Sequence, residues 1–150
     1  MVPCGTTTCF VEFLDFIGSA KDKGVEAAKG LFKNYQNLPY RIFAFAPAKK
    51  VELETTKALL NEEPVIGLGE FDHFTYSSEN AESMEAMACA KVAGGLVNGH
   101  WGLTTLSDND LNIIPAIGAN NNHDVWNSDD IAKSLRYGFA TQIKFGVGKV

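Results

Sequence analysis

Residues 65 to 70 of the chain read VIGLGE, and this short stretch decides the fold. The apolar run at residues 65 to 69 is typical of a short strand that is buried on both faces, as in a parallel sheet. Glu70, Asp72 and His73 follow just past the predicted end of this strand. Parallel α/β proteins keep their functional groups at the carboxyl ends of strands, so the stretch predicts both a strand and a site beside it.

The rest of the chain alternates in the same way between strand patterns and helix patterns. Ser107 and Ser128 are predicted to cap two of the helices. Because one strand and one helix together take about 20 to 30 residues, we expect an α/β fold of parallel βα repeats. Further strands are predicted at residues 5–11, 40–46 and 139–145, and a very short strand begins at residues 96–97 and leads to residues 98–100. Helices are predicted at residues 24–37, 50–61, 81–92, 108–117 and from 128 onward.

The composition is that of an ordinary globular protein. The chain has 150 residues, of which 45% are hydrophobic and 21% charged, and this suits a single domain over residues 1–150. Its net charge of -5 and pI of about 5.1 disfavour nucleic acid and anionic membranes as partners. No apolar run approaches the roughly 20 residues that cross a bilayer, and the N-terminus lacks the pattern of a secretion signal. We therefore expect neither a nucleic-acid nor a membrane partner.

Three cysteines, Cys4, Cys9 and Cys89, bear on the compartment. Their odd number and wide spacing argue against a disulfide framework and for a reducing, cytoplasmic location. The spacing of Cys4 and Cys9 is not a strong signature of a redox or metal pair. Both are interpreted as ordinary small residues.

Three successive predicted strand ends carry a possible metal ligand: Glu70, His100 and His123. The chain has only three histidines, and the third, His73, lies three residues past Glu70. A carboxylate and two imidazoles suit zinc, iron or manganese, and water bound to such a metal becomes a usable nucleophile near neutral pH. The pattern therefore predicts a divalent-metal site.

Simpler interpretations stay open on the residues alone. A histidine after a strand is more often a loop residue than a ligand, and Glu70 by itself could be a surface charge. Asp72, Asp124 and Trp101 could line a pocket, although plain loop positions are favoured. The run at residues 120–122, NNN, could bind a polar ligand, but a turn is expected there. The chain lacks a complete dinucleotide fingerprint, a P-loop and a nucleophile elbow.

Several segments together carry a family resemblance. They read VPCGTTT (2–8), PVIGLGE (64–70), LVNGHWGL (96–103), DLN (110–112), NNHD (121–124) and SDDIAKSLRYG (128–138). In their order and spacing they resemble the central part of the catalytic barrel of bacterial and archaeal adenine deaminases, in the amidohydrolase superfamily. The resemblance spans almost all of the chain. It implies a partial (β/α)8 TIM barrel of the metal-dependent hydrolase type.

The resemblance also implies an activity of purine metabolism and a ligand set. The reaction is the hydrolytic deamination of adenine to hypoxanthine and ammonia, so adenine is the expected small-molecule partner. The expected cofactor is a divalent metal, either manganese, iron or zinc. The implied metal ligands are Glu70, His100 and His123, and Glu70 is also the residue for which a catalytic role is expected.

The chain departs from the family pattern mildly at residues 122–124, which read NHD where the family has an SDHE-type turn, and more seriously in two ways. Family members carry Asp-Pro-His-Glu after the Thr-rich strand, whereas residues 12–15 read EFLD here, which replaces the histidine by Leu14. The family's His-x-His pair from the first barrel strand and its aspartate from the last strand do not lie in this chain. A complete barrel needs about 250 residues and eight strands, and this chain supplies about five or six strands. We therefore interpret residues 1–150 as a fragment or truncated form of the barrel.

Two expectations follow for the isolated chain. With an incomplete ligand set it should be inactive or nearly so. With two open sheet edges it should form homo-oligomers or need a complementary chain. Two other functions stay open: a non-catalytic truncated relative that is a binding or structural remnant, and a small α/β domain that binds a small molecule at its strand ends without metal.

Overall fold

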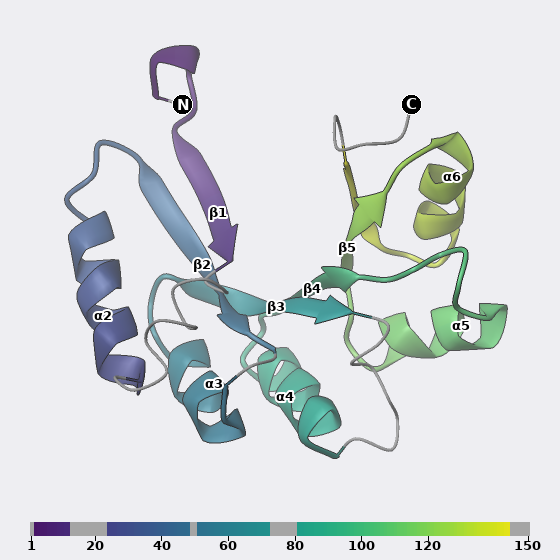
Figure 1. Ribbon diagram of the computed structural model, residues 1–150, viewed down its shortest axis with the longest axis horizontal. Coiled ribbons are helices and arrows are strands. Elements are labelled where there is room, and N and C mark those ends of the chain that lie inside the picture. Colours follow the sequence, from purple (N-terminus) through teal and green to yellow (C-terminus); the bar gives the residue numbers. More distant parts are fainter. Residues whose placement is uncertain (1, 13–23, 49–50, 73–80, 145–150) are drawn as a thin grey trace.

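The computed structural model describes residues 2–12, 24–48, 51–72 and 81–144, and it shows strands and helices in alternation (Figure 1). The strands are β1 (Thr8–Glu12), β2 (Arg41–Pro47), β3 (Val65–Asp72), β4 (Leu96–His100), β5 (Asn121–Val125) and β6 (Ala140–Ile143). The helices are η1 (Val2–Cys4), α2 (Gly24–Tyr35), α3 (Leu53–Leu60), α4 (Ala81–Val92), α5 (Asp108–Ala116) and α6 (Ser128–Arg136).

The six strands form one sheet in chain order, and every neighbouring pair is parallel. The strand direction turns progressively from β1 to β6, so the sheet curls into a half-barrel with the helices along its outside (Figure 1). This arrangement is a partial TIM barrel and confirms the predicted fold class. Because all strands are parallel, their carboxyl ends meet along one rim. None of the helices in the described ranges has the length and apolarity that crossing a membrane requires.

The main hydrophobic core lies between the sheet and the helices. β2 contributes small residues, Ala44 and Ala46, which let the helices approach the sheet closely. Leu68 and Val97, from the two strands that follow, are completely buried, and burial of such a side chain contributes roughly 1.5 to 3 kcal/mol. The helical side chains that pack on this layer include Phe32, Leu59, Met87 and Ile114.

Strand β3 is longer than predicted, and it contains Glu70. Its pairing with β4 is irregular between Leu68 and Phe71, as in a β-bulge, and Glu70 has a left-handed φ of 57° at this point. Leu68 and Phe71 both remain in the buried core. The prediction that β3 ends at residue 69 was therefore wrong, because the bulge lets the strand continue to Asp72. β4 begins at Leu96, as predicted, and His100 is its last residue.

Two further local predictions have different outcomes. Ser107 caps α5 in a capping box with Asp110, as expected. Ser128, in contrast, is the first residue of α6, and the cap is Asn127, whose Oδ1 accepts from the backbone N–H groups of Asp129 at 2.9 Å and Asp130 at 3.0 Å.

The asparagine run does not form the expected turn. Asn120 Oδ1 accepts from the Val97 backbone N–H at 2.8 Å. Asn122 Oδ1 accepts from the Trp101 N–H at 3.3 Å, and its Nδ2 donates to the Trp101 carbonyl at 3.3 Å. The run therefore cross-links β4 and β5, because buried amide side chains can satisfy backbone groups of the neighbouring strand and its continuation.

Candidate metal centre

The structure brings together Glu70 from β3, His100 from β4 and His123 from β5. His100 Nε2 lies 3.1 Å from Glu70 Oε2, and His123 Nε2 lies 3.7 Å from Glu70 Oε1. The two imidazole Nε2 atoms are 3.0 Å apart. Within the described part of the chain, these three residues are a group that could hold a metal ion, with one ligand atom from each lying within 4.8 Å of the others. We call them the His–Glu cluster.

The spacing of these atoms suits a single cation. Ligand atoms about 2.1 Å from a tetrahedral metal lie roughly 3.4 Å from each other. The three observed separations, 3.0, 3.1 and 3.7 Å, bracket that value. One carboxylate and two imidazoles are also the donor types that zinc, iron and manganese accept. The residues present therefore fit the predicted cofactor class.

The bulge in β3 sets the direction of the Glu70 side chain. A left-handed φ is uncommon for any residue other than glycine and carries a cost of roughly 1 to 3 kcal/mol when a fold imposes it. Bulges occur beside active sites because they re-aim a side chain without breaking the sheet. In this chain the bulge places the Glu70 carboxylate against both histidines while Phe71, the next residue, stays in the core.

The pairing of β4 with β5 brings the two histidines together. Gly99 lies opposite Asn122 in this parallel pair, so the residues that follow them, His100 and His123, are neighbours. Their rings meet edge to face, with centroids 4.0 Å apart and planes at 75°. Gly99 is required here, since a Cβ would lie 2.5 Å from the Phe71 carbonyl oxygen. The close approach of β3 and β4 thus depends on the glycine that precedes His100.

Electrostatics favour an ionised Glu70 and a neutral His123. Burial alone would raise the pKa of Glu70, but its hydrogen bond with Glu12 and the nearby imidazoles of His100 and His123 outweigh burial and lower the pKa. Burial and the neighbouring His100 lower the pKa of His123 from 6.5 to about 4. A carboxylate and a neutral imidazole are the forms that bind a metal.

Sequence reasoning missed two residues of this site, Glu12 and Asn98. Glu12, the last residue of β1, forms a side-chain hydrogen bond with Glu70, and burial together with that neighbour raises the pKa of Glu12 to about 8. Asn98 Nδ2 donates to Glu12 Oε1 at 2.6 Å, while Asn98 Oδ1 lies 2.9 Å from His123 Nδ1. The strand-end rule applies equally to Glu12, and Asn98 shares a strand face with His100 two residues later.

The other predicted neighbours have structural roles or lie outside the described residues. Trp101 is completely buried, stacks on Phe71 with ring centroids 5.9 Å apart, and donates from Nε1 to the Asn121 carbonyl at 3.0 Å. Asp124 accepts from Trp126 Nε1 at 2.9 Å. Asp72 ends β3, and His73 lies outside the described residues, as do residues 13–15 of the departing motif.

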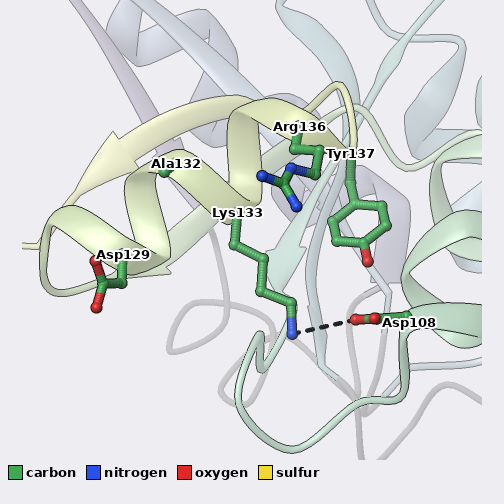
Figure 2. Close-up of a pocket in the computed structure, with 6 residues that line it drawn as sticks. All are labelled: Asp108, Asp129, Ala132, Lys133, Arg136 and Tyr137. Atoms are coloured by element: carbon green, nitrogen blue, oxygen red, sulfur yellow. Dashed lines mark ion pairs between the residues drawn. The ribbon is translucent and has the colours of Figure 1, made fainter.

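Away from the His–Glu cluster, a hollow of about 340 Å³ lies between α5 and α6 and is lined mainly by charged side chains. Figure 2 shows Lys133 extended across it toward Asp108, with the Tyr137 ring beside them. Lys133 Nζ is 3.4 Å from Asp108 and donates to the Leu103 carbonyl at 2.8 Å. A hydrogen bond from Tyr137 also lowers the pKa of Asp108. Lys133, Asp108 and Tyr137 thus contact each other, and these contacts hold α5 and α6 together.

Comparison with known proteins agrees with this description. The chain is 30% identical, over 158 aligned residues, to a protein named adenine deaminase from Desulforamulus reducens. The alignment covers 97% of this chain and 26% of that protein, so the chain spans about a quarter of the length of the relative. The resemblance to adenine deaminases that the motifs indicated is confirmed. No family model matches the chain.

The fold is similar to that of a crystal structure of a dihydroorotase. The TM-score is 0.55, and the superposition covers 93% of this chain and 44% of the other, with 19% sequence identity. At this identity the likeness concerns the fold alone. The five βα units and the final strand of this chain thus resemble a part of that longer chain.

Proposed function

We propose that this chain, a relative of adenine deaminase over nearly all of its length, is part of a metal-dependent aminohydrolase that deaminates adenine to hypoxanthine and ammonia. One observation carries the proposal: Glu70, His100 and His123, remote in sequence, converge at the carboxyl ends of three successive parallel strands. The similarity to adenine deaminase supports the substrate, and the donor set supports a divalent metal such as manganese, iron or zinc.

In this proposal each residue of the site has a defined task. The Nε2 atoms of His100 and His123 and the Glu70 carboxylate hold the cation, which when bound lowers the pKa of a water molecule to near neutrality. Glu12 holds a proton at the carboxyl oxygen that faces Glu70, because burial and Glu70 both raise its pKa. Glu70 thus has two partners, the cation site and the proton on Glu12, and this position supports its predicted catalytic role.

Metal analysis tests the cation site directly. Purified protein, stripped with a chelator and then incubated separately with zinc, manganese or iron(II), should retain about one equivalent of at least one metal. His100→Gln and His123→Gln should each reduce retention at least tenfold, since each removes one of three ligands. Glu54→Gln is the matched control, because Glu54 is a highly exposed carboxylate of α3 that pairs with Lys57. Equal retention in all four proteins would contradict the proposal.

A second assay separates an enzyme from a non-catalytic relative. Three ligands converge in the described part of the chain, and the family histidine of the Asp-Pro-His-Glu motif is replaced by Leu14. We therefore expect the isolated chain to bind metal but to release little or no ammonia from adenine, with or without added manganese. Ammonia release that depends on His100 and His123 would instead show that the chain is an enzyme by itself. Metal binding without turnover favours the binding-remnant function for the isolated chain.

The location in a reducing compartment stays a prediction. It depends on Cys4, Cys9 and Cys89, which are free in the structure, and Cys4 is exposed. Exposed free thiols are compatible with a reducing environment.

A further inference from the structure

We infer that Asn98, held in place by Glu12, is a positioning residue that fixes the tautomer of His123, so that the Nε2 atom of His123 is free of a proton and can bind a cation. This inference rests on the proposed function and deepens it. It concerns two residues, Asn98 and Glu12, that lie next to the His–Glu cluster without belonging to it.

Glu12 determines which way the Asn98 amide points. Glu12 Oε1 lies 2.6 Å from Asn98 Nδ2, a short hydrogen bond. Glu12 also shares a hydrogen bond with the Glu70 carboxylate. A carboxyl group has one proton at most, and Glu70 is an acceptor when ionised, so a Glu12 proton belongs on the oxygen that faces Glu70. Oε1 therefore accepts in either protonation state of Glu12, and the amide must turn its NH₂ group toward it.

The amide orientation in turn determines the tautomer of His123. With Nδ2 turned toward Glu12, Asn98 presents Oδ1 to His123 Nδ1 at 2.9 Å. An amide oxygen only accepts, so His123 Nδ1 carries the proton and donates it. A neutral imidazole has one N–H group, which leaves a lone pair on Nε2. That atom lies 3.0 Å from His100 Nε2 and 3.7 Å from Glu70 Oε1, at the centre of the His–Glu cluster.

The opposite orientation of the Asn98 amide would be unfavourable at both of its partners, Glu12 and His123. If the Asn98 amide were reversed, its oxygen would face Glu12 Oε1, and a proton between them would have to leave the oxygen that faces Glu70. Two carboxyl oxygens, those of Glu12 and Glu70, would then face each other without a proton. His123 would carry its proton on Nε2, where it would point into the proposed cation site. Partners that fix the tautomer of a ligating histidine typically change metal affinity 10- to 100-fold when they are removed.

Nitrogen NMR of the histidine rings tests this inference in the metal-free protein near pH 7.5. His123 should show a pyrrole-type shift at Nδ1 and a pyridine-type shift at Nε2, with the resonances assigned by their loss in His123→Gln. In Asn98→Leu the two tautomers should mix. In Asn98→Asp the carboxylate still accepts from Nδ1, so the wild-type tautomer should return. A purely structural role for Asn98 predicts no such rescue, because the carboxylate of the Asn98→Asp variant cannot donate to Glu12.

Zinc affinity of the full chain, measured by competition with a chromophoric chelator, gives the second result. Asn98→Leu should weaken binding roughly 10- to 100-fold, and Asn98→Asp should lose less than about threefold. Asn120→Leu is the matched control, since Asn120 also links the β4 and β5 segments through Val97 but does not contact His123 among the described hydrogen bonds. It should lower stability and leave zinc affinity unchanged.

The outcomes separate this inference from the proposed function. An Nε2–H tautomer in the wild type, wild-type zinc affinity in Asn98→Leu, or failure of Asn98→Asp to restore the tautomer would each overturn the role of Asn98. The expected tautomer in a wild-type protein that binds no metal would overturn the proposed function and leave the hydrogen-bond relay standing. Zinc binding by a wild-type protein in which His123 has the opposite tautomer would overturn the role of Asn98 and leave the proposed function standing.

Discussion

Glu70 combines a strained backbone with the central carboxylate of the His–Glu cluster. Its φ of 57° lies in the left-handed region, which costs an L-residue with a Cβ roughly 1 to 2 kcal/mol. Glycine adopts this conformation without that cost. The geometry is maintained because the strand continues through the bulge and Phe71 returns to the core. An observed outlier at a candidate site supports a functional reason for the strain.

This strain predicts an inverted order of stability for two variants of Glu70. Glu70→Gly and Glu70→Ala both remove the carboxylate, but only glycine relieves the backbone. We expect the glycine variant to be more stable by about 1 kcal/mol, although glycine within a strand is ordinarily less stable than alanine by roughly 0.5 to 1 kcal/mol. Urea unfolding of both variants in the presence of a chelator measures the difference. An alanine variant more stable than the glycine variant by roughly 0.5 to 1 kcal/mol, the ordinary order in a strand, would show that the backbone at position 70 is not strained.

The raised pKa of Glu12 predicts how the stability of the metal-free protein depends on pH. Between pH 6.5 and 8 the folded protein keeps a proton on Glu12 that the unfolded chain, with its ordinary value of 4.5, has released. Stability should therefore fall as pH rises through this window, by at most about 1.4 kcal/mol per pH unit. The pKa of His123 is lowered from 6.5 to about 4. Its contribution to stability therefore rises with pH between those two values, below this window. Urea unfolding at several pH values with a chelator measures the slope.

Glu12→Gln is the matched variant for this prediction, because glutamine keeps the shape and an acceptor oxygen but has no proton to release. Its stability should vary less between pH 6.5 and 8 than that of the wild type. Equal slopes in the two proteins would assign the pH dependence to another group. The convergence of Glu70, His100 and His123 could be predicted from the sequence because strand ends in parallel folds meet at one rim. Glu12 and Asn98 could not be given roles, because a hydrogen-bond relay depends on side-chain directions that spacing alone does not define.

At the scale of the element, α6 begins at two adjacent polar residues, Asn127 and Ser128, and only Asn127 caps the helix. Asn127 Oδ1 accepts from two backbone N–H groups, whereas Ser128 lies inside the helix. Asn127→Ala should lower the free energy of unfolding by about 1 kcal/mol, and Ser128→Ala should change it by less than about 0.5 kcal/mol. Thermal or urea unfolding of both variants checks the pair. A larger loss in Ser128→Ala would restore the cap that the sequence pattern indicated.

The order and type of the elements could be predicted because apolar periodicity and capping residues are local signals. The predicted elements at residues 40–46, 81–92 and 108–117 match β2, α4 and α5 closely, and the strand predicted from residue 65 begins where β3 begins. The bulge at Glu70 and the role of the asparagine run could not be predicted, since both depend on the neighbouring strand. Asn122, for example, is buried only because its amide binds the backbone of Trp101 across the sheet.

At the scale of the whole molecule, the half-barrel leaves two strands with a single neighbour each among the described strands. β1 pairs with β2 alone and β6 with β5 alone. Phe10 shares a face of β1 with Glu12, because side chains alternate along a strand, so it lies on the concave face with the candidate site. It stacks on Phe43 with ring centroids 5.7 Å apart, yet 60% of its surface is exposed. An exposed phenylalanine, stacked on a half-buried one beside an open sheet edge, favours association.

We therefore expect the isolated chain to self-associate at micromolar concentration in sedimentation velocity experiments. Phe10→Ser should weaken that association roughly tenfold or more, because burial of a phenylalanine contributes roughly 1.5 to 3 kcal/mol. Leu135→Ser is the matched control. Leu135 is equally exposed, at 60%, but belongs to helix α6 on the outside of the sheet (Figure 1), so its replacement should leave association unchanged. A monomeric wild type, or equal effects of the two substitutions, would contradict association through the concave face. If Phe10→Ser alone weakens association, the concave face that carries the His–Glu cluster is also the face that a second chain covers.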